Sequence, residues 1–218
     1  MKMTDEPRPT SRRLNVPASH GHLEAILREA SAPFAAVVVC HPHPLGGGTM
    51  NNNVVYRVAK VLGDAGAAVL RFNFRGVGQS TGRFDHGDGE EDDARAALDQ
   101  LAELYPDAPL WMAGFSFGAR VGLTVGTDDA RVQKLLGVGL AMKMFDYGFL
   151  TRTPKPKAFI QGENDEYGAR ADIEALFATA APPKHLTVVD GATHLFPQHL
   201  DALEQAAAEA IAFLRAQG

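Results

Sequence analysis

The 218-residue chain has one cysteine, no excess of basic residues and no long apolar run. The single cysteine, Cys40, cannot form an internal disulfide and excludes a cysteine-rich zinc site. The net charge of -5, without a basic stripe, argues against a nucleic-acid partner. No apolar run approaches the ~18 residues that span a membrane. We therefore expect neither a nucleic-acid nor a membrane partner, while the oligomeric state stays open.

The start of the chain, MKMTDEPRPTSRR, mixes both charges with prolines and has no apolar core of the kind that a secretion signal needs. We expect residues 1–11 to form a loose tail and the protein to be cytoplasmic. Hydrophobic residues make up 45% and charged residues 22% of the chain, which is typical of an ordinary globular protein.

Short apolar runs alternate with segments of helical periodicity along the chain. Residues 12–18 and 21–30 flank a turn and predict an antiparallel hairpin. The expected later strands cover residues 34–40, 67–74, 109–114, 134–142, 157–162 and 185–190. The expected helices cover residues 54–65, 94–104, a segment from 117, a segment around 173–177, and 200–214. This alternation predicts one α/β domain over residues 1–218, with a mainly parallel sheet and helices on both faces.

Ligands of such sheets bind beyond the carboxyl ends of the strands, so reactive residues directly after strands are the candidates for function. Ser116 lies in GFSFG, between an expected strand and an expected helix. A serine between two glycines at this point is typical of a sharp turn that exposes a nucleophile. The alternative is a simple packing turn.

A serine hydroxyl needs a neighbouring base before it can act as a nucleophile. Among the eight histidines, His20 and His22 fall in the hairpin, at the wrong place in the sheet. His185 opens a strand and therefore lies at its opposite end, and His199 falls in the first turns of the last helix. His194 follows the last strand, where a base can reach across to the serine. The sequence therefore favours His194.

The base in turn needs an acid that fixes its tautomer. Asp165 follows the penultimate strand, and Asp146 follows the strand before it. We favour Asp165 because its strand is expected to neighbour the strand that leads to the histidine. Glu163 and Glu166 lie close to Asp165 in the sequence, but the residues beside Asp165 are expected to face elsewhere.

With these three residues in this order, the chain resembles the α/β-hydrolase superfamily along nearly its whole length. The order Ser116, Asp165, His194 is that of these hydrolases and differs from the chymotrypsin and subtilisin orders. The resemblance implies an eight-stranded, mostly parallel sheet, a Ser-Asp-His triad, and hydrolysis of an ester-type bond without a cofactor. Three segments carry it: GFSFG, GENDEYG and GATHLF. The loops HPHPLGGGTMNN and RFNFRGVGQSTG also look like those after the third and fourth strands of small bacterial members.

The loop CHPHPLGGG is expected to supply half of an oxyanion hole, with the N–H of Phe117 as the other half. Pro42 and Pro44 have no N–H to donate. The donor is therefore His43 or Leu45, and similarity to the family favours His43.

Three features of the sequence raise the alternative of a metal or phosphate site. His41 and His43 share a face of extended chain, but no third ligand is evident, so we expect no metal. RGVGQSTGR lacks the spacing of a phosphate loop and is expected to be a turn beside the active-site loop. The acidic run DHGDGEEDDA is expected to place favourable charge at a helix N-terminus.

The connection KMFDYGFLTRTPKP is too short for the helical cap domain that many α/β-hydrolases insert there. The candidate substrate pocket consists of apolar residues from two loops: Leu45, Met142, Met144, Phe145 and Tyr147, with Phe149 beside them. We therefore expect a capless serine hydrolase that acts on carboxylic esters with small or short acyl groups. The alternatives are a thioesterase or peptidase with the same triad and, from another class, a non-catalytic binding protein of this fold.

Overall fold

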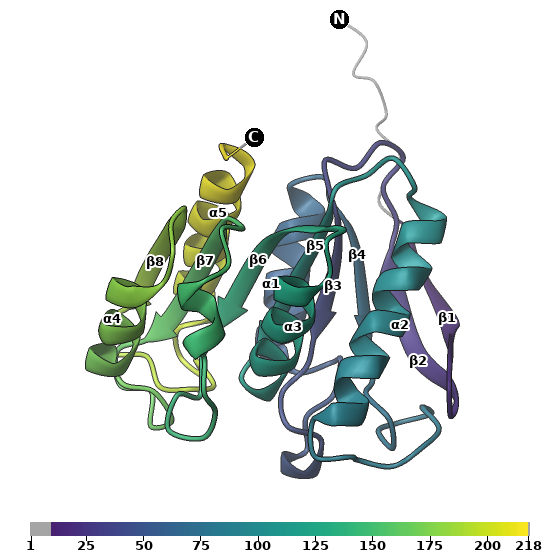
Figure 1. Cartoon of the computed structure of the whole chain (residues 1–218), viewed down its shortest axis with the longest axis horizontal. Helices are drawn as coiled ribbons and strands as arrows, with labels where there is room; N and C mark the ends of the chain where they lie inside the picture. Colours follow the sequence, from purple (N-terminus) through teal and green to yellow (C-terminus); the bar gives the residue numbers. More distant parts are fainter. Residues whose placement is uncertain (1–9, 218) are drawn as a thin grey trace, which may run out of the picture.

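The computed structural model describes residues 10–217 and contains an eight-stranded sheet of order β1-β2-β4-β3-β5-β6-β7-β8 (Figure 1). Strands β3 to β8 are parallel, while β2 runs antiparallel to both of its neighbours. The strands are β1 (Ser11–Ala18), β2 (Gly21–Arg28), β3 (Ala36–Cys40), β4 (Ala68–Phe72), β5 (Leu110–Phe115), β6 (Val132–Val138), β7 (Lys157–Gly162) and β8 (Lys184–Val189). The predicted fold class is confirmed.

Helices cover both faces of this sheet, α1 and α5 on one face and α2, α3 and α4 on the other (Figure 1). The helices are α1 (Asn53–Asp64), α2 (Asp88–Leu104), α3 (Phe117–Asp128), α4 (Arg170–Thr179) and α5 (Leu200–Arg215), with 3-10 turns η1 (Pro44–Gly46) and η2 (Gly148–Thr151). None of the helices within residues 10–217 is long and apolar enough to cross a bilayer.

Strand β3 shows why its sequence, AVVVC, is apolar throughout. Val37 and Val39 pack into the core under α1 and α5, and Val38 and Cys40 pack into the core under α2 and α3. A strand in the middle of a parallel sheet has no solvent-facing side, so alternation of polar and apolar residues is lost.

Several of the predicted boundaries are wrong. The strand expected over residues 134–142 ends at Val138, because Gly139 turns the chain with a φ of 54°. The helix expected over residues 94–104 already begins at Asp88. Ser11 belongs to β1 and not to a tail; residues 1–9 of the predicted tail lie outside the described part of the chain.

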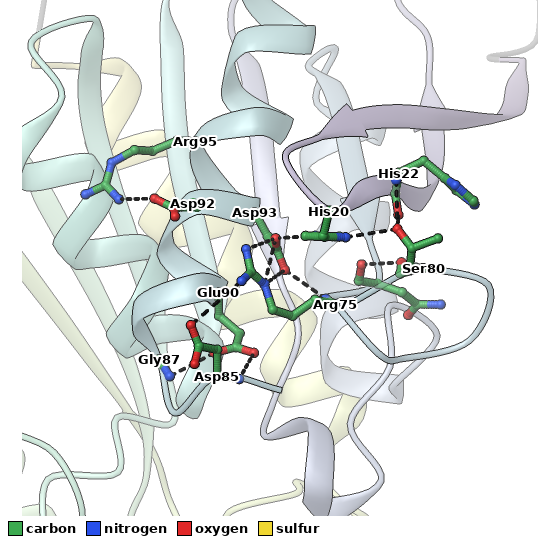
Figure 2. Close-up of polar contacts among 12 residues, drawn as sticks. His20, His22, Arg75, Ser80, Asp85, Gly87, Glu90, Asp92, Asp93 and Arg95 are labelled. Atoms are coloured by element: carbon green, nitrogen blue, oxygen red, sulfur yellow. Dashed lines mark hydrogen bonds and ion pairs between the residues drawn. The ribbon is translucent and has the colours of Figure 1, made fainter. Parts of the chain in front are cut away.

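A buried polar cluster fastens the β1–β2 hairpin to the rest of the fold. Figure 2 shows His20 from the hairpin turn, Arg75 from the loop after β4 and Asp93 from α2 pointing toward one another. The fully buried Asp93 carboxylate accepts hydrogen bonds from Arg75 Nη2 at 2.8 Å and lies 2.9 Å from His20 Nε2. Burial opposes the charge on Arg75, but the bonds to Asp93 outweigh it and raise the pKa of Arg75.

The acidic run around the start of α2 therefore does more than place charge at a helix N-terminus. Asp88, Glu90 and Glu91 do lie in the first turn, as expected. Glu90, however, is buried, and its carboxylate accepts the N–H groups of Asp85 and Gly87 at 3.0 and 2.8 Å. Through these two bonds Glu90 holds the loop before α2 against the first turn of the helix.

Replacing Asp93 with alanine is expected to lower the free energy of unfolding by about 3–5 kcal/mol. The largely buried Arg75 and His20 would lose the carboxylate they share, and Arg75 would keep only the more distant Asp85 at 3.9 Å. The neighbouring Asp92 is the matched control, since its side chain is 67% exposed and pairs only with Arg95. Asp92→Ala is expected to change stability by less than about 0.5 kcal/mol. Urea unfolding of both variants checks this, and equal losses would contradict it.

Candidate active site

Ser116 lies on the turn between β5 and α3, with a φ of 58° that is uncommon for a residue with a side chain. A Cβ atom on Gly114 would lie less than 3.0 Å from the carbonyl oxygen of Gly118. A Cβ atom on Gly118 would come equally close to the carbonyl oxygens of Cys40 and His41. Two glycines therefore let α3 begin directly against the ends of β5 and β3, which holds the serine on a sharp turn at the carboxyl edge of the sheet.

His194 reaches this serine from the loop after β8, and Asp165 reaches the histidine from the loop after β7. His194 Nε2 lies 2.8 Å from Ser116 Oγ, and His194 Nδ1 lies 2.8 Å from Asp165 Oδ2. A carboxylate can only accept, so Nδ1 donates its proton to Asp165 and Nε2 is left to accept from the serine hydroxyl. Ser116, His194 and Asp165 are 9%, 5% and 1% exposed. The chain of hydrogen bonds is thus largely shielded from water.

The alternative acid, Asp146, is exposed on the loop after β6, where its Oδ1 accepts the N–H of Gly148 at 2.8 Å. The expectation that the strand before Asp165 neighbours the strand before His194 is met, because β7 and β8 pair in parallel. The order of the strands therefore brings Asp165, and not Asp146, to the histidine.

The two glutamates beside Asp165 also contact the histidine loop, so the expectation that they face elsewhere is wrong. Glu163 Oε2 accepts the N–H of Gly191 at 2.9 Å, and Glu166 Oε2 accepts the N–H of His194 at 3.2 Å. The loop after β7 thus holds the backbone of the histidine loop as well as its imidazole ring.

The imidazole of His194 also has neighbours that the sequence analysis missed. The ring of Phe115 lies 5.0 Å from it on one side, and the half-exposed ring of Tyr167 lies 4.8 Å from it on another. The buried amide of Gln161 lies 2.9 Å from Asp165 Oδ2. The sequence did contain a signal for Gln161, because a polar amide within the apolar run AFIQG is unusual. It contained no such signal for Phe115 or Tyr167.

The loop after β3 is held by His41, whose side chain is fully buried. Its Nδ1–H donates to the carbonyl of Pro42 at 2.6 Å, and its Nε2 accepts the N–H of Phe74 at 3.0 Å. Burial lowers the pKa of His41 to about 4, since a charged ring would lose its water and could not accept from Phe74. Both nitrogens are engaged within the protein. Among residues 10–217, no group of three or more His, Cys, Asp or Glu side chains is arranged to hold a metal.

The same loop has a backbone N–H near its start that can serve a bound substrate. The N–H of Leu45 already donates to Nδ1 of His43 at 3.2 Å, and the flanking prolines have none. The N–H of His43 is therefore the candidate donor here. On the other side of the serine, Phe117 is the first residue of α3, and N–H groups of a first turn have no acceptor within their helix.

The five predicted pocket residues differ in burial. Leu45 and Met144 are 75% and 57% exposed, while Met142 and Phe145 are half-buried against the core. Tyr147 is buried in the core itself. Of the five, Tyr147 alone is closed off from solvent, and the other four stay candidates for contact with a substrate.

An aromatic cluster that includes an unpredicted residue lies beside the serine. The ring of His43 lies 4.9 Å from those of Phe84 and Phe117, and the ring of Phe145 lies 6.0 Å from that of Phe117. Phe84 comes from the loop after β4, whose Asn73 Oδ1 accepts the N–H of Met50 at 2.8 Å. The predicted turn itself, residues 75–83, instead bonds the β1–β2 hairpin, through Ser80 to Glu24 and through Thr81 to His22. The site thus has an apolar side next to the two candidate N–H donors.

The connection from β6 to β7 contains only the short turn η2, so the described chain has no cap domain over the serine. Two cavities, of about 240 and 500 Å³, lie against α1 and α3 respectively, and neither is lined by Ser116, Asp165 or His194. The predicted absence of a cap is confirmed.

A family model described as the alpha/beta hydrolase fold matches residues 36–159 of the chain. The chain belongs to the α/β-hydrolase family. The matched residues run from β3 to the middle of β7 and include the serine turn.

Relatives of this α/β-hydrolase cover most of its length. An uncharacterized protein of Rickettsia prowazekii is 38% identical over 186 residues, which are 81% of this chain and 78% of that protein. The solved structure of an alpha-beta serine hydrolase homologue from Coxiella burnetii matches with a TM-score of 0.83 and 35% identity, covering 96% of this chain and 98% of the other. A serine hydrolase without lid from Xanthomonas campestris matches with a TM-score of 0.84 and 31% identity, covering 95% of each chain. The protein thus has the fold of serine hydrolases.

The buried His41 predicts a loss of stability of this α/β-hydrolase in mild acid. Unfolded chains take up the proton near the ordinary pKa of 6.5, whereas the folded protein takes it up only near 4. Stability therefore falls as the pH drops from about 6.5 to about 4, by at most about 3 kcal/mol, and this group causes no further loss below that. His41→Asn is expected to be less stable at neutral pH but to lack this part of the acid loss, as urea unfolding at about pH 7 and 4.5 measures. An equal acid loss in both proteins would place the titrating group elsewhere.

Proposed function

We propose that this α/β-hydrolase cleaves carboxylic esters, with Ser116 as nucleophile, His194 as base and Asp165 as the acid that orients the histidine. The observation that carries the proposal is the unbroken chain of two 2.8 Å hydrogen bonds from the serine hydroxyl through the imidazole to the buried carboxylate. We place the reaction in the cytoplasm on the sequence argument alone, and its substrate is a small molecule.

In the first half of the proposed reaction, Ser116 Oγ attacks the carbonyl carbon while His194 Nε2 takes the hydroxyl proton. The N–H groups of Phe117 and His43 donate to the oxyanion that forms. The tetrahedral intermediate then collapses, the ester C–O bond breaks, and His194 returns the proton to the departing alcohol. Asp165 stays ionised and stabilises the imidazolium that exists between the two proton transfers.

In the second half, water replaces the alcohol. His194 takes a proton from the water, the resulting hydroxide attacks the acyl carbon, and the acid leaves as Ser116 recovers its proton. Because no cap covers the site, water reaches the acyl-enzyme directly, which suits hydrolysis better than acyl transfer to another alcohol.

The same residues support a thioesterase or a peptidase, since these reactions share the acyl-enzyme and the oxyanion. A non-catalytic binding protein of this fold is the weaker alternative, because binding alone requires no hydrogen-bonded serine, histidine and aspartate. Assays on p-nitrophenyl esters, acyl-CoA thioesters and a peptide panel separate these functions.

Ser116→Ala is expected to abolish hydrolysis of p-nitrophenyl acetate, with a loss in kcat on the order of 10⁴ to 10⁶, because no other group can form the acyl-enzyme. The circular dichroism spectrum and the unfolding midpoint of the variant serve as controls for its fold. Retention of a tenth of the wild-type rate would show that another residue is the nucleophile.

Asp165→Asn is expected to lower kcat by roughly 10² to 10⁴, because His194 loses its acceptor at Nδ1 and with it the correct tautomer. Asp146→Asn is the matched control and is expected to stay within a few-fold of wild type, since Asp146 bonds only its own loop. Steady-state values of kcat for both variants test this. A large loss in Asp146→Asn with little loss in Asp165→Asn would instead identify Asp146, in the loop after β6, as the acid.

Esters from acetate to about hexanoate are expected to be preferred over palmitate. Leu45 and Met144 are mostly exposed, so they bury little of a long acyl chain, and each further methylene gains less than the ~0.8 kcal/mol of full burial. Values of kcat/KM from acetate to palmitate, below and above micelle formation, measure this. A steady rise to palmitate, or a jump in rate at the micelle threshold, would show that the loop around Met144 closes over the serine.

A further inference from the structure

Gln161, near the end of β7, has a fully buried side chain whose amide hydrogen bonds join three segments. Its Oε1 accepts the N–H of Leu140, in the loop after β6, at 2.8 Å. Its Nε2 donates to the carbonyl of Gly168 at 2.7 Å and to Asp165 Oδ2 at 2.9 Å. The amide therefore ties the loop that carries the acid to the loop that follows the neighbouring strand.

These partners fix which way the amide points. The N–H of Leu140 needs an acceptor, while the carbonyl of Gly168 and the carboxylate of Asp165 both need donors. A flipped amide would set oxygen against both acceptors and nitrogen against the donor. Only the observed orientation satisfies all three groups, so Gln161 presents an N–H to Asp165.

The bond from Gln161 ends on the same carboxylate oxygen that accepts the proton of His194 Nδ1. The other oxygen, Oδ1, accepts the N–H of Tyr167 at 2.9 Å. Within residues 10–217, Gln161 and His194 are the two side chains that hydrogen-bond this carboxylate. Removal of Gln161 would leave a single backbone bond to set its rotation against the histidine.

We propose that Gln161 is a positioning residue, whose donated hydrogen bond fixes the rotation of the Asp165 carboxylate and thereby directs His194 toward Ser116. This inference rests on the proposed function, because it assigns Gln161 a part in the same proton transfer. The chemistry of the side chain fits the task. A neutral amide donates without adding charge, whereas lysine or arginine would compete with the imidazolium for the carboxylate.

Gln161→Glu tests this role through the pH dependence of the reaction. At low pH the introduced carboxylic acid is protonated and still donates one O–H to Asp165, whereas at higher pH two carboxylates repel each other within hydrogen-bond distance. The loss in kcat/KM relative to wild type is expected to grow from on the order of tenfold at about pH 6 to a hundredfold or more at about pH 9. KM is expected to change by no more than a few-fold.

The other titratable groups around this carboxylate are His194, Glu163, Glu166, Tyr167 and the buried Tyr147, and both proteins contain all of them. The ratio of the two pH profiles therefore reports on residue 161 alone. Gln133→Glu, at the exposed start of the neighbouring strand β6, is the matched control for added charge and is expected to follow wild type throughout.

A second variant, Gln161→Met, keeps the length of the side chain and removes its donor. Its kcat is expected to fall by roughly tenfold to a hundredfold at unchanged KM, and the fraction of folded protein is measured by circular dichroism. A readout independent of activity is the far-downfield proton resonance of His194 Nδ1–H, which is expected to shift or broaden in both Gln161 variants and to stay in place in Gln133→Glu.

Ester hydrolysis and the positioning role of Gln161 can each be contradicted without the other. If wild type hydrolyses no ester but the His194 resonance moves in the Gln161 variants, the proposed function fails and the positioning role stands. If the wild-type enzyme is active, a Gln161→Glu profile parallel to that of wild type, with an unmoved His194 resonance, overturns the positioning role. A constant loss at every pH with an unmoved resonance overturns it as well, because a merely structural residue gives that result.

Discussion

The site depends on one close approach of backbone to backbone, between the first turn of α3 and the ends of β3 and β5. Gly114 and Gly118 permit it, since a Cβ atom at either position would meet a carbonyl group at less than 3.0 Å. The approach leaves Ser116 in a left-handed conformation, with its N–H bonded to the carbonyl of Val138 at 3.0 Å. Strain of this kind persists only where the surroundings over-determine it. At Ser116 the surroundings that hold this conformation are the ends of β3, β5 and β6 and the first turn of α3.

Around this turn, five loops are each fastened to a neighbour by a hydrogen bond from a side chain, and the sixth, the Ser116 turn, by its backbone bond to Val138. His41 and Asn73 join the loops after β3 and β4, and Gln161 joins those after β6 and β7. Glu163 and Glu166 join the loops after β7 and β8. The resulting belt along the carboxyl edge explains how six loops hold groups within hydrogen-bond distance without a cap domain above them.

The parts of this arrangement that repeat along the chain were predictable, and the parts that depend on contacts between distant loops were not. Periodicity gave the order of strands and helices, and strand neighbours then favoured Asp165 over Asp146. The roles of Gln161 and Glu166 depend on which carbonyl or N–H group a folded loop presents, which no local pattern encodes. The burial of Tyr147 was not predictable either, because an aromatic residue in a loop has the same sequence signature whether it faces the core or a substrate.

The central claim is that the hydroxyl of Ser116 is the group that attacks a carbonyl or phosphonyl centre. Reaction of the native protein with a fluorophosphonate, followed by proteolysis and mass spectrometry of the peptides, tests it most directly. The account predicts one adduct per chain, on Ser116, and none after prior unfolding in urea, because the hydroxyl reacts only beside His194. An adduct on another residue, or equal labelling of the unfolded chain, would contradict it.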